Sequence, residues 1–256
     1  MSITQYPRAL LAVVLALPLT MLASLGAWLT MLLLHWPSRR AMIFPRAWGR
    51  GICRMAGVDV MVEGAEHLQD EATYIFAGNH ASQFDIFCFQ GYFPHDFRWI
   101  AKKELFRIPL FGPAMRSVGS IAIDRGHGRE AMKSLEQAAR SIAAGTSVLI
   151  FPEGTRSPDG RLREFKTGAI LLAMRAGVPV VPLAFIGTHA ILPKGRRLPR
   201  PGRVIIRIGS PIDPHQYRAG QKQELARHLR QQVAALLEGA ENNTTFRSRQ
   251  TTDNMA

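Results

Sequence analysis

A run of 26 residues without a charged side chain, Ala9–Leu34, constrains this chain of 256 residues more than any other feature. As a helix it would reach about 39 Å at about 1.5 Å per residue, more than a bilayer core of about 30 Å. Pro18 lies inside the run, so a tilted span and a bent insertion into one leaflet are both compatible with it. A cleaved signal peptide is the alternative, but the run is long for one. We therefore predict a membrane-associated helical segment.

Basic residues outnumber acidic ones, with 32 Lys and Arg against 19 Asp and Glu and a formal net charge of +13. This charge favours an anionic partner such as nucleic acid, a phospholipid surface or a phosphorylated substrate. Five arginines between residues 39 and 54 follow the apolar run, whereas Arg8 alone precedes it. The positive-inside rule then predicts a protein of the cytoplasmic (inner) membrane whose folded domain faces the cytoplasm.

The segment from Trp36 to Val58 mixes aromatic, apolar and basic residues. It fits an interfacial helix among anionic headgroups and, equally, an amphipathic helix packed on the domain. A second basic stretch, Lys194–Arg203, is too rich in Pro and Gly for a helix, so we expect a loop whose partner is lipid headgroups. No nucleic-acid partner is expected, because the chain shows no aromatic RNA-binding or groove-reading motif.

After Val58, short apolar runs alternate with helical segments, which is typical of an α/β sheet covered on both faces. We predict a single mixed sheet flanked by helices. The expected strands are Val58–Val62, Tyr74–Ala77, Phe97–Ala101, Ser120–Ile123, Val148–Phe151, Val180–Phe185 and Val204–Ile208. The expected helices are Ser82–Gln90, Arg129–Ala143, Thr167–Ala176 before Gly177, and Gln221–Leu237.

Three parts follow from this pattern: residues 1–57 as membrane and interfacial helices, 58–238 as the α/β domain, and 239–256 as a disordered tail. Two prolines in Val178–Pro182 predict an edge strand or a bulge there. The two cysteines, Cys53 and Cys88, are far apart in the sequence and show no metal-like spacing, so neither a disulfide framework nor a metal site is expected.

The strongest functional pattern is His80 with Asp85, in Asn79-His80-Ala81-Ser82-Gln83-Phe84-Asp85. A histidine can take a proton from a hydroxyl when a carboxylate bonded to its other nitrogen fixes the tautomer. Asp85 could instead complete a capping box with Ser82 as the N-cap. The two roles are compatible, since a capping carboxylate would hold its second oxygen toward His80.

Polar clusters follow other predicted strands in the same way. Asp124-Arg125 follows one strand and Pro152–Ser157 another, and ligands bind at the carboxyl ends of strands in open α/β sheets. Arg125 and Arg156 offer planar forks of donors for phosphate. Gly154 allows close backbone approach, while Glu153 and Thr155 could orient a polyol. Lys102 and Lys103, after a further strand, could add charge or simply be exposed.

Together these blocks resemble the 1-acyl-sn-glycerol-3-phosphate acyltransferases, which make phosphatidic acid from lysophosphatidic acid. His80 with Asp85 looks like the family's His-x4-Asp motif, Phe151–Ser157 its Phe-Pro-Glu-Gly-Thr-Arg-Ser block, and Gly119–Arg125 and Val178–Pro182 its other two blocks. The resemblance implies that His80 deprotonates the acceptor hydroxyl, oriented by Asp85. It further implies that the acceptor is held by Arg125, Glu153, Gly154, Thr155 and Arg156.

The predicted function is therefore acyl transfer from acyl-CoA or acyl carrier protein to a lysophospholipid in a membrane, with no cofactor and no metal. No Gly-x-Ser-x-Gly motif appears, so direct attack by the acceptor is simpler than an acyl-enzyme. Lys102 could help to stabilise the oxyanion. Two alternatives remain: another lysolipid as acceptor, such as an ornithine-type lyso-amino-acid lipid, and a non-catalytic adaptor for anionic membranes.

Overall fold

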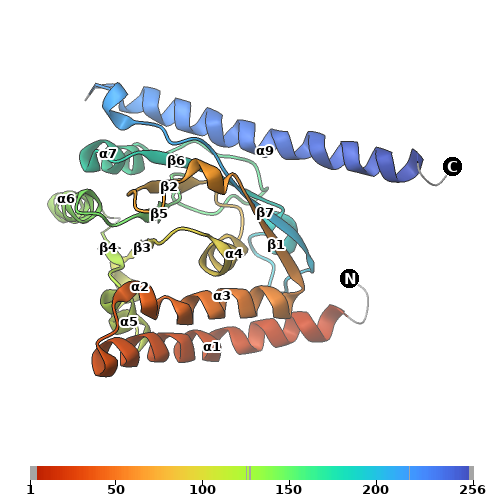
Figure 1. Ribbon diagram of the computed structural model, residues 1–256, viewed down its shortest axis with the longest axis horizontal. Coiled ribbons are helices and arrows are strands. Elements are labelled where there is room, and N and C mark those ends of the chain that lie inside the picture. The colour runs from red at the N-terminus through yellow and green to blue at the C-terminus, as the bar shows by residue number, and fades with distance from the viewer. Residues whose placement is uncertain (1–4, 125, 127, 219, 254–256) are drawn as a thin grey trace.

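The computed structural model describes residues 5–253 except 125, 127 and 219, and the side chains of residues 5, 6 and 240–253 lie outside this description. The described residues form a seven-stranded sheet in the order β1-β7-β6-β2-β5-β3-β4 (Figure 1). The strands are β1 (Val58–Glu63), β2 (Ile75–Gly78), β3 (Arg98–Lys102), β4 (Ile121–Ile123), β5 (Val148–Ile150), β6 (Val180–Ile186) and β7 (Gly202–Ile208).

The sheet is mixed, as predicted. All its pairs are parallel except β6 with β7, so β1 and β7 run against the other five strands. The predicted α/β fold with one mixed sheet flanked by helices is confirmed, and each predicted strand ends within two residues of its predicted limits. Because β2, β5, β3 and β4 are parallel neighbours, their carboxyl ends share one edge.

The prolines of Val178–Pro182 predicted an edge strand or a bulge, and the edge strand is wrong. The pairing is irregular beside Pro182, because two residues of β6 separate the pairs Val180–Ile212 and Leu183–Ile208, whereas three residues separate their partners. Strand β6 lies inside the sheet, between β7 and β2. Its ladder with β7 begins at Leu183, one residue after Pro182, so the missing N–H of Pro182 removes no bond from that ladder. The Pro182 carbonyl still accepts from the Gly209 N–H at 2.9 Å. A proline is thus accommodated where the strand changes partners.

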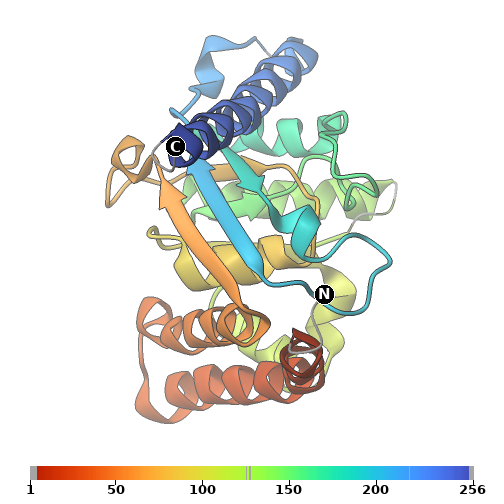
Figure 2. The same cartoon turned by 90° about the vertical axis from the view of Figure 1, so that its right-hand side faces the viewer.

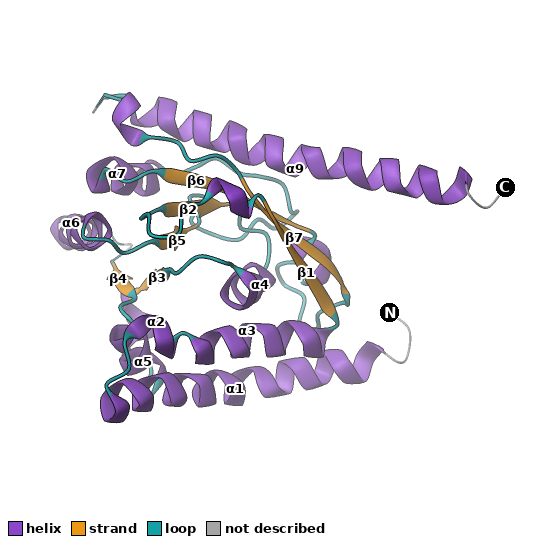
Figure 3. Ribbon diagram, viewed as in Figure 1, coloured by secondary structure: helices purple, strands orange, loops and turns teal. Residues whose placement is uncertain are grey.

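Helices cover both faces of the sheet (Figure 3). The described helices are α1 (Gln5–Leu34), α2 (Ser38–Ala41), α3 (Ile43–Ala56), α4 (Phe84–Tyr92), α5 (Phe111–Ser117), α6 (Arg129–Ala143), α7 (Thr167–Ala176), α8 (Thr188–Ile191) and α9 (Lys222–Asp253), with 3-10 turns η1 (Ala65–His67), η2 (Lys103–Arg107) and η3 (Pro214–Gln216). Figures 1 and 2 show α1 and α3 side by side on one side of the sheet and α9 on the other.

One side of helix α1 packs on the domain, and its other side is exposed. Its segment Pro7–Leu34 is long and apolar enough to cross a membrane, with a mean hydropathy of 2.3. Toward the domain, Trp48 of α3 donates to the Thr20 hydroxyl at 3.0 Å. Away from it, Val14 and Leu17 are 60% and 68% exposed. This apolar surface is consistent with membrane association.

Helix α3 lies between α1 and α4. A Cβ on Gly49 would meet the backbone of α4 at 2.7 Å, at Phe87 O and Gly91 N, so the two helices approach as closely as a glycine permits. The helix predicted from the basic segment Trp36–Val58 is therefore packed on the domain. The Sγ atoms of Cys53 and Cys88 lie 3.8 Å apart in this interface as buried free thiols, which their sequence separation gave no reason to expect.

The C-terminal helix is longer than predicted. Helix α9 passes Leu237 and continues to Asp253, and so enters segment 239–256, for which the sequence predicted disorder. The first half packs on the sheet and on α7 through buried residues such as Leu225, Leu229 and Val233. The three-part division of the chain stays a prediction.

Candidate active site

His80 and Asp85 meet at the end of strand β2. The Nδ1 atom of His80 lies 2.8 Å from Oδ2 of Asp85, whose side chain is fully buried. The same oxygen accepts the backbone N–H groups of Ala81 and Ser82, each at 2.9 Å. Asp85 therefore orients the imidazole and braces the first turn of α4 through one oxygen, rather than with one oxygen for each role as the sequence suggested.

This bond defines what the imidazole can do. With its Nδ1–H donated to Asp85, the Nε2 atom of His80 carries a lone pair and can accept a proton. The ring is stacked on Phe151 with centroids 4.0 Å apart and an interplanar angle of 13°. The carboxylate and the stacked ring together fix the orientation of His80.

The turn that follows strand β5 also supports the His80 loop. The Glu153 Oε1 atom accepts the His80 N–H at 2.7 Å, and the Ser157 N–H donates to the His80 carbonyl, also at 2.7 Å. Asn79 holds the loop to β6 with a pair of bonds to the backbone of Phe185, at 3.1 and 2.7 Å. Three strand ends thus position one imidazole.

Glu153 is buried, with 3% of its surface exposed. Burial raises the pKa of its carboxyl group, and the backbone N–H donors of His80 and Arg163 oppose that shift. Glu153 therefore supports the His80 loop through its hydrogen bond with the His80 backbone.

The other predicted binding residues are spread along the same edge. Gly154 has φ 76°, and a Cβ there would lie 3.1 Å from the Lys166 side chain. Lys102 and Gly154 line the cavity beside His80, whereas Thr155 and Arg156 lie in the partly exposed turn outside the cavity wall. Arg125 lies outside the described residues.

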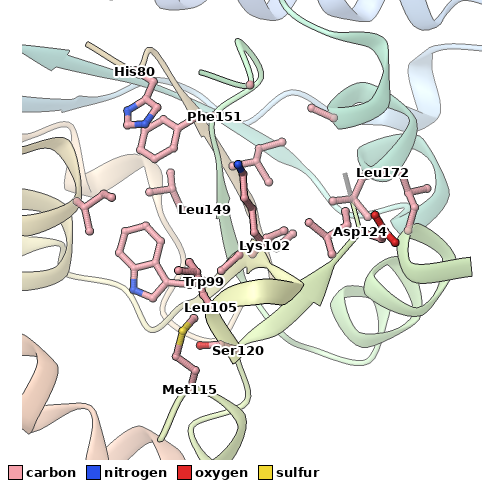
Figure 4. A pocket seen from close by; sticks show the side chains of 18 of the residues that line it. His80, Trp99, Lys102, Leu105, Met115, Ser120, Asp124, Leu149, Phe151 and Leu172 are labelled. Atoms are coloured by element: carbon pink, nitrogen blue, oxygen red, sulfur yellow. The ribbon is translucent and has the colours of Figure 1, made fainter. Parts of the chain in front are cut away.

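Lys103 and Asp124 form an ion pair at this edge. The ammonium group donates to Oδ2 at 2.6 Å, and this bond lowers the pKa of Asp124 and raises that of Lys103. Lys103 is thus paired, and Lys102 is the lysine of the two that faces the cavity (Figure 4).

A cavity of about 1030 Å³ opens beside His80. In Figure 4, His80 and Phe151 lie at one side of it, Leu149 and Trp99 in the middle, and Met115 and Ser120 at the opposite side. Its walls come from α1, α3, α4, α5, α6, α7 and the ends of β3, β4 and β5, and they are mainly apolar. Such a cavity suits a long apolar ligand whose reactive end lies at the imidazole.

Sequence reasoning missed several residues of this site. Phe151 is part of a motif that the sequence displayed, but its stacking on His80 depends on the register between β2 and β5. Lys166, Trp99, Thr20 and Met115 line the cavity from four distant segments, and no local pattern marks them. In the described part of the chain, no group of His, Cys, Asp and Glu side chains could hold a metal ion.

The chain belongs to the Acyltransferase family, whose sequence model matches residues 59–186. The chain is 35% identical to the 1-acyl-sn-glycerol-3-phosphate acyltransferase of Cocos nucifera over 76% of its own length and 64% of that protein. It is 30% identical to the protein of the same name from Borreliella burgdorferi, over 78% of this chain and 80% of that one.

A solved structure has the same fold. The crystal structure of the 1-acyl-sn-glycerophosphate acyltransferase from Thermotoga maritima matches with a TM-score of 0.76 and 28% identity, covering 94% of this chain and 98% of the other. The predicted resemblance to the 1-acyl-sn-glycerol-3-phosphate acyltransferases is confirmed. The roles of individual site residues stay predictions.

Proposed function

We propose that this protein is a membrane-bound enzyme that moves a fatty acyl group from a thioester to the sn-2 hydroxyl of 1-acylglycerol-3-phosphate, giving phosphatidic acid. The observation that carries this proposal is the bond between His80 and the buried Asp85, on the wall of a long apolar cavity. The names of the relatives support the acceptor. The apolar face of α1 supports the membrane location. The five arginines after α1, against Arg8 alone at its start, support a domain on the cytoplasmic side.

The chemistry needs one general base. His80 Nε2 takes the proton of the acceptor hydroxyl as its oxygen attacks the thioester carbonyl carbon. The tetrahedral intermediate collapses with cleavage of the carbon–sulfur bond, and the thiolate or thiol leaves. Because a thiol has a pKa of about 8.5, it departs with little help from a general acid. The proton held by the imidazole neutralises the departing sulfur.

Direct attack is favoured over an acyl-enzyme. The two cysteines are fully buried between α3 and α4, and the hydrogen bond with Cys53, together with burial, raises the pKa of Cys88 well above its usual range. A thiol in this state is a poor nucleophile. Acyl-CoA or acyl carrier protein acts as a co-substrate, and neither a cofactor nor a metal is needed.

Cationic side chains at the strand edge would hold the acceptor phosphate. Lys102 and Lys166 line the cavity wall near His80, and Arg156 lies in the turn after β5. A guanidinium or ammonium group bonded to a phosphate makes a charge-assisted hydrogen bond, which is stronger than a neutral one. This arrangement favours a phosphorylated acceptor over a lyso-amino-acid lipid. The ordered base and cavity favour an enzyme over a non-catalytic adaptor.

An acceptor panel tests this proposal. Purified full chain with a labelled acyl donor should acylate lysophosphatidic acid at least about tenfold faster than lysophosphatidylcholine or a lyso-ornithine lipid. Arg156→Ala should raise KM for lysophosphatidic acid more than it lowers kcat, because it removes a phosphate contact and leaves the base in place. Equal rates on all three acceptors would contradict the proposed substrate, and an unchanged KM would remove Arg156 from the site.

A further inference from the structure

A second cavity, of about 590 Å³, lies on the opposite side of helix α3 from the acyl cavity. Its walls carry five arginines from α2 and α3: Arg39, Arg40, Arg46, Arg50 and Arg54. Met42, Pro45 and Trp48, on the other face of the same segment, line the first cavity. The two cavities share no lining residue in the described part of the chain. A ligand in the second cavity would therefore be separate from the reacting groups.

The positive charge of this cavity is poorly balanced. Asp96 is the one carboxylate among its described lining residues, and its Oδ1 atom already accepts from Arg98 at 2.8 Å. Arg39 has a loose contact of 3.7 Å with Glu71, and both side chains are exposed. Such an exposed pair contributes little. Five guanidinium groups thus surround a space whose one lining carboxylate is already paired.

Two of the arginines are held in place by neutral groups. Arg50 donates to the Gly91 carbonyl at 2.7 Å and Arg46 to the His95 carbonyl at 3.4 Å. Burial lowers the pKa of Arg46; nearby Asp96 opposes this shift, and Arg50, Arg39 and Arg98 add to it. The carbonyls fix the geometry without cancelling the charge, so an added anion would relieve the repulsion.

The surroundings point to an anion that carries an apolar tail. Ile43 lines the cavity and is 59% exposed, and the exposed leucines Leu32, Leu33 and Leu34 end helix α1 directly before α2. Arg40 lies over the Trp36 ring at 4.1 Å in a cation–π contact, and Trp is enriched at membrane interfaces. The end of the cavity that carries Arg39, Arg40 and Ile43 therefore adjoins exposed apolar side chains.

We propose that this arginine cavity binds the phosphate group of an anionic glycerophospholipid as a non-reacting lipid site. Guanidinium groups match phosphate oxygens in geometry and charge, and the exposed apolar side chains beside them suit the acyl chains. The bound lipid contacts helices α2 and α3, and α3 also forms part of one wall of the acyl cavity. Lipid binding to this cavity is measured without turnover, so the test of this site does not depend on the proposed acyl transfer.

Binding is measured with the full chain in an uncharged detergent, by calorimetry with dihexanoyl phosphatidylglycerol, dihexanoyl phosphatidylcholine and inorganic phosphate as probes. We expect phosphatidylglycerol to bind at least about tenfold more tightly than the other two. Arg46→Gln with Arg54→Gln should weaken this binding by at least about tenfold. Lys133→Gln with Arg140→Gln on α6 removes the same charge from exposed positions and should change it less than about twofold.

Three results would overturn the proposal. Equal weakening by the two double variants would show a general charge effect, and inorganic phosphate binding as tightly as the lipid would show a site for free phosphate. Loss of binding in Lys102→Gln, but not in Arg46→Gln with Arg54→Gln, would put the lipid in the acyl cavity. A thermal melt checks folding, and Arg39→Gln with Arg54→Gln, both at exposed positions, gives a second variant with the same expected loss.

Discussion

At the scale of single residues, Asp85 connects local folding to the proposed chemistry. Its Oδ2 atom accepts three N–H groups, two from the backbone before α4 and one from the imidazole. The two backbone bonds fix the position of the oxygen before any substrate arrives. Since that oxygen holds Nδ1 of His80, the tautomer needed by a general base is set by the structure of the loop itself.

Glu153 gives a pH-dependent prediction at this scale. Burial raises the pKa of the folded carboxyl group, so the folded state binds a proton more firmly than the unfolded state. The resulting stabilisation is full below the unfolded pKa of about 4.5 and is lost as pH rises through the folded value. Glu153→Gln removes this titration. The difference in melting temperature, wild type minus variant, should therefore fall as pH rises above about 4.5; a constant difference would contradict this.

The sequence predicted the contact between His80 and Asp85 but not that of Glu153, for a physical reason. His80 and Asp85 are five positions apart, so local geometry nearly dictates their contact, and the sequence predicted it. Glu153 lies 73 residues from His80, and its contact depends on how β2 pairs with β5. A carboxylate after a strand could face a ligand or a neighbouring loop, and the sequence pattern does not distinguish the two.

At the scale of elements, the position of α4 depends on its contact with α3. Gly49 allows the two backbones to approach, and a Cβ would meet Phe87 O and Gly91 N at 2.7 Å. Two positions later, a Cβ on Gly51 would meet nothing within 4 Å. The two glycines lie in the same helix, so replacing each with alanine distinguishes the effect of close packing from that of helix propensity.

Gly49→Ala should destabilise the protein by about 1–3 kcal/mol, because neither backbone can move aside easily. It should also lower activity, since α4 carries Asp85. Gly51→Ala should leave activity unchanged and stabilise α3 by up to about 1 kcal/mol. Denaturant unfolding of both variants measures this, and equal stabilities would mean that the α3–α4 contact is not restrictive.

Elements were easier to predict than their arrangement. Short apolar runs marked all seven strands, and Gly177 marked the end of α7, where it has φ 65°. Helices α5 and α8 were missed, because α5 contains Gly112 and Pro113 and α8 has only four residues. Both are too short to show a helical period.

At the scale of the whole molecule, helix α1 contributes to both the acyl cavity and an exposed apolar surface. Its inner side contributes Thr20, Ser24 and Ala27 to the acyl cavity, and its outer side exposes aliphatic residues along its length. The proposed acceptor is a lipid, so a cavity wall formed by the membrane-associated helix would let an acyl chain enter without crossing water. The sequence predicted the membrane segment but not its place in the cavity wall, because that contact depends on tertiary packing.

Glutamates on the outer side of α1 should release the protein from membranes. Val14→Glu with Leu17→Glu places charge where each substitution costs about 2.5–3.5 kcal/mol in a bilayer centre, while the inner packing stays intact. In a vesicle flotation assay with about 1 M salt, wild type and a Val14→Leu with Leu17→Ile control should float and the glutamate variant should not. Flotation of the glutamate variant would contradict insertion of this surface.

The central claim is that His80 is the general base, and acyl transfer by His80→Ala tests it most directly. With purified full chain, lysophosphatidic acid and a labelled acyl thioester, the rate should fall by about 10²–10⁴, while the melting temperature and vesicle flotation stay close to wild type. Turnover equal to wild type in a folded, membrane-bound His80→Ala protein would contradict the account.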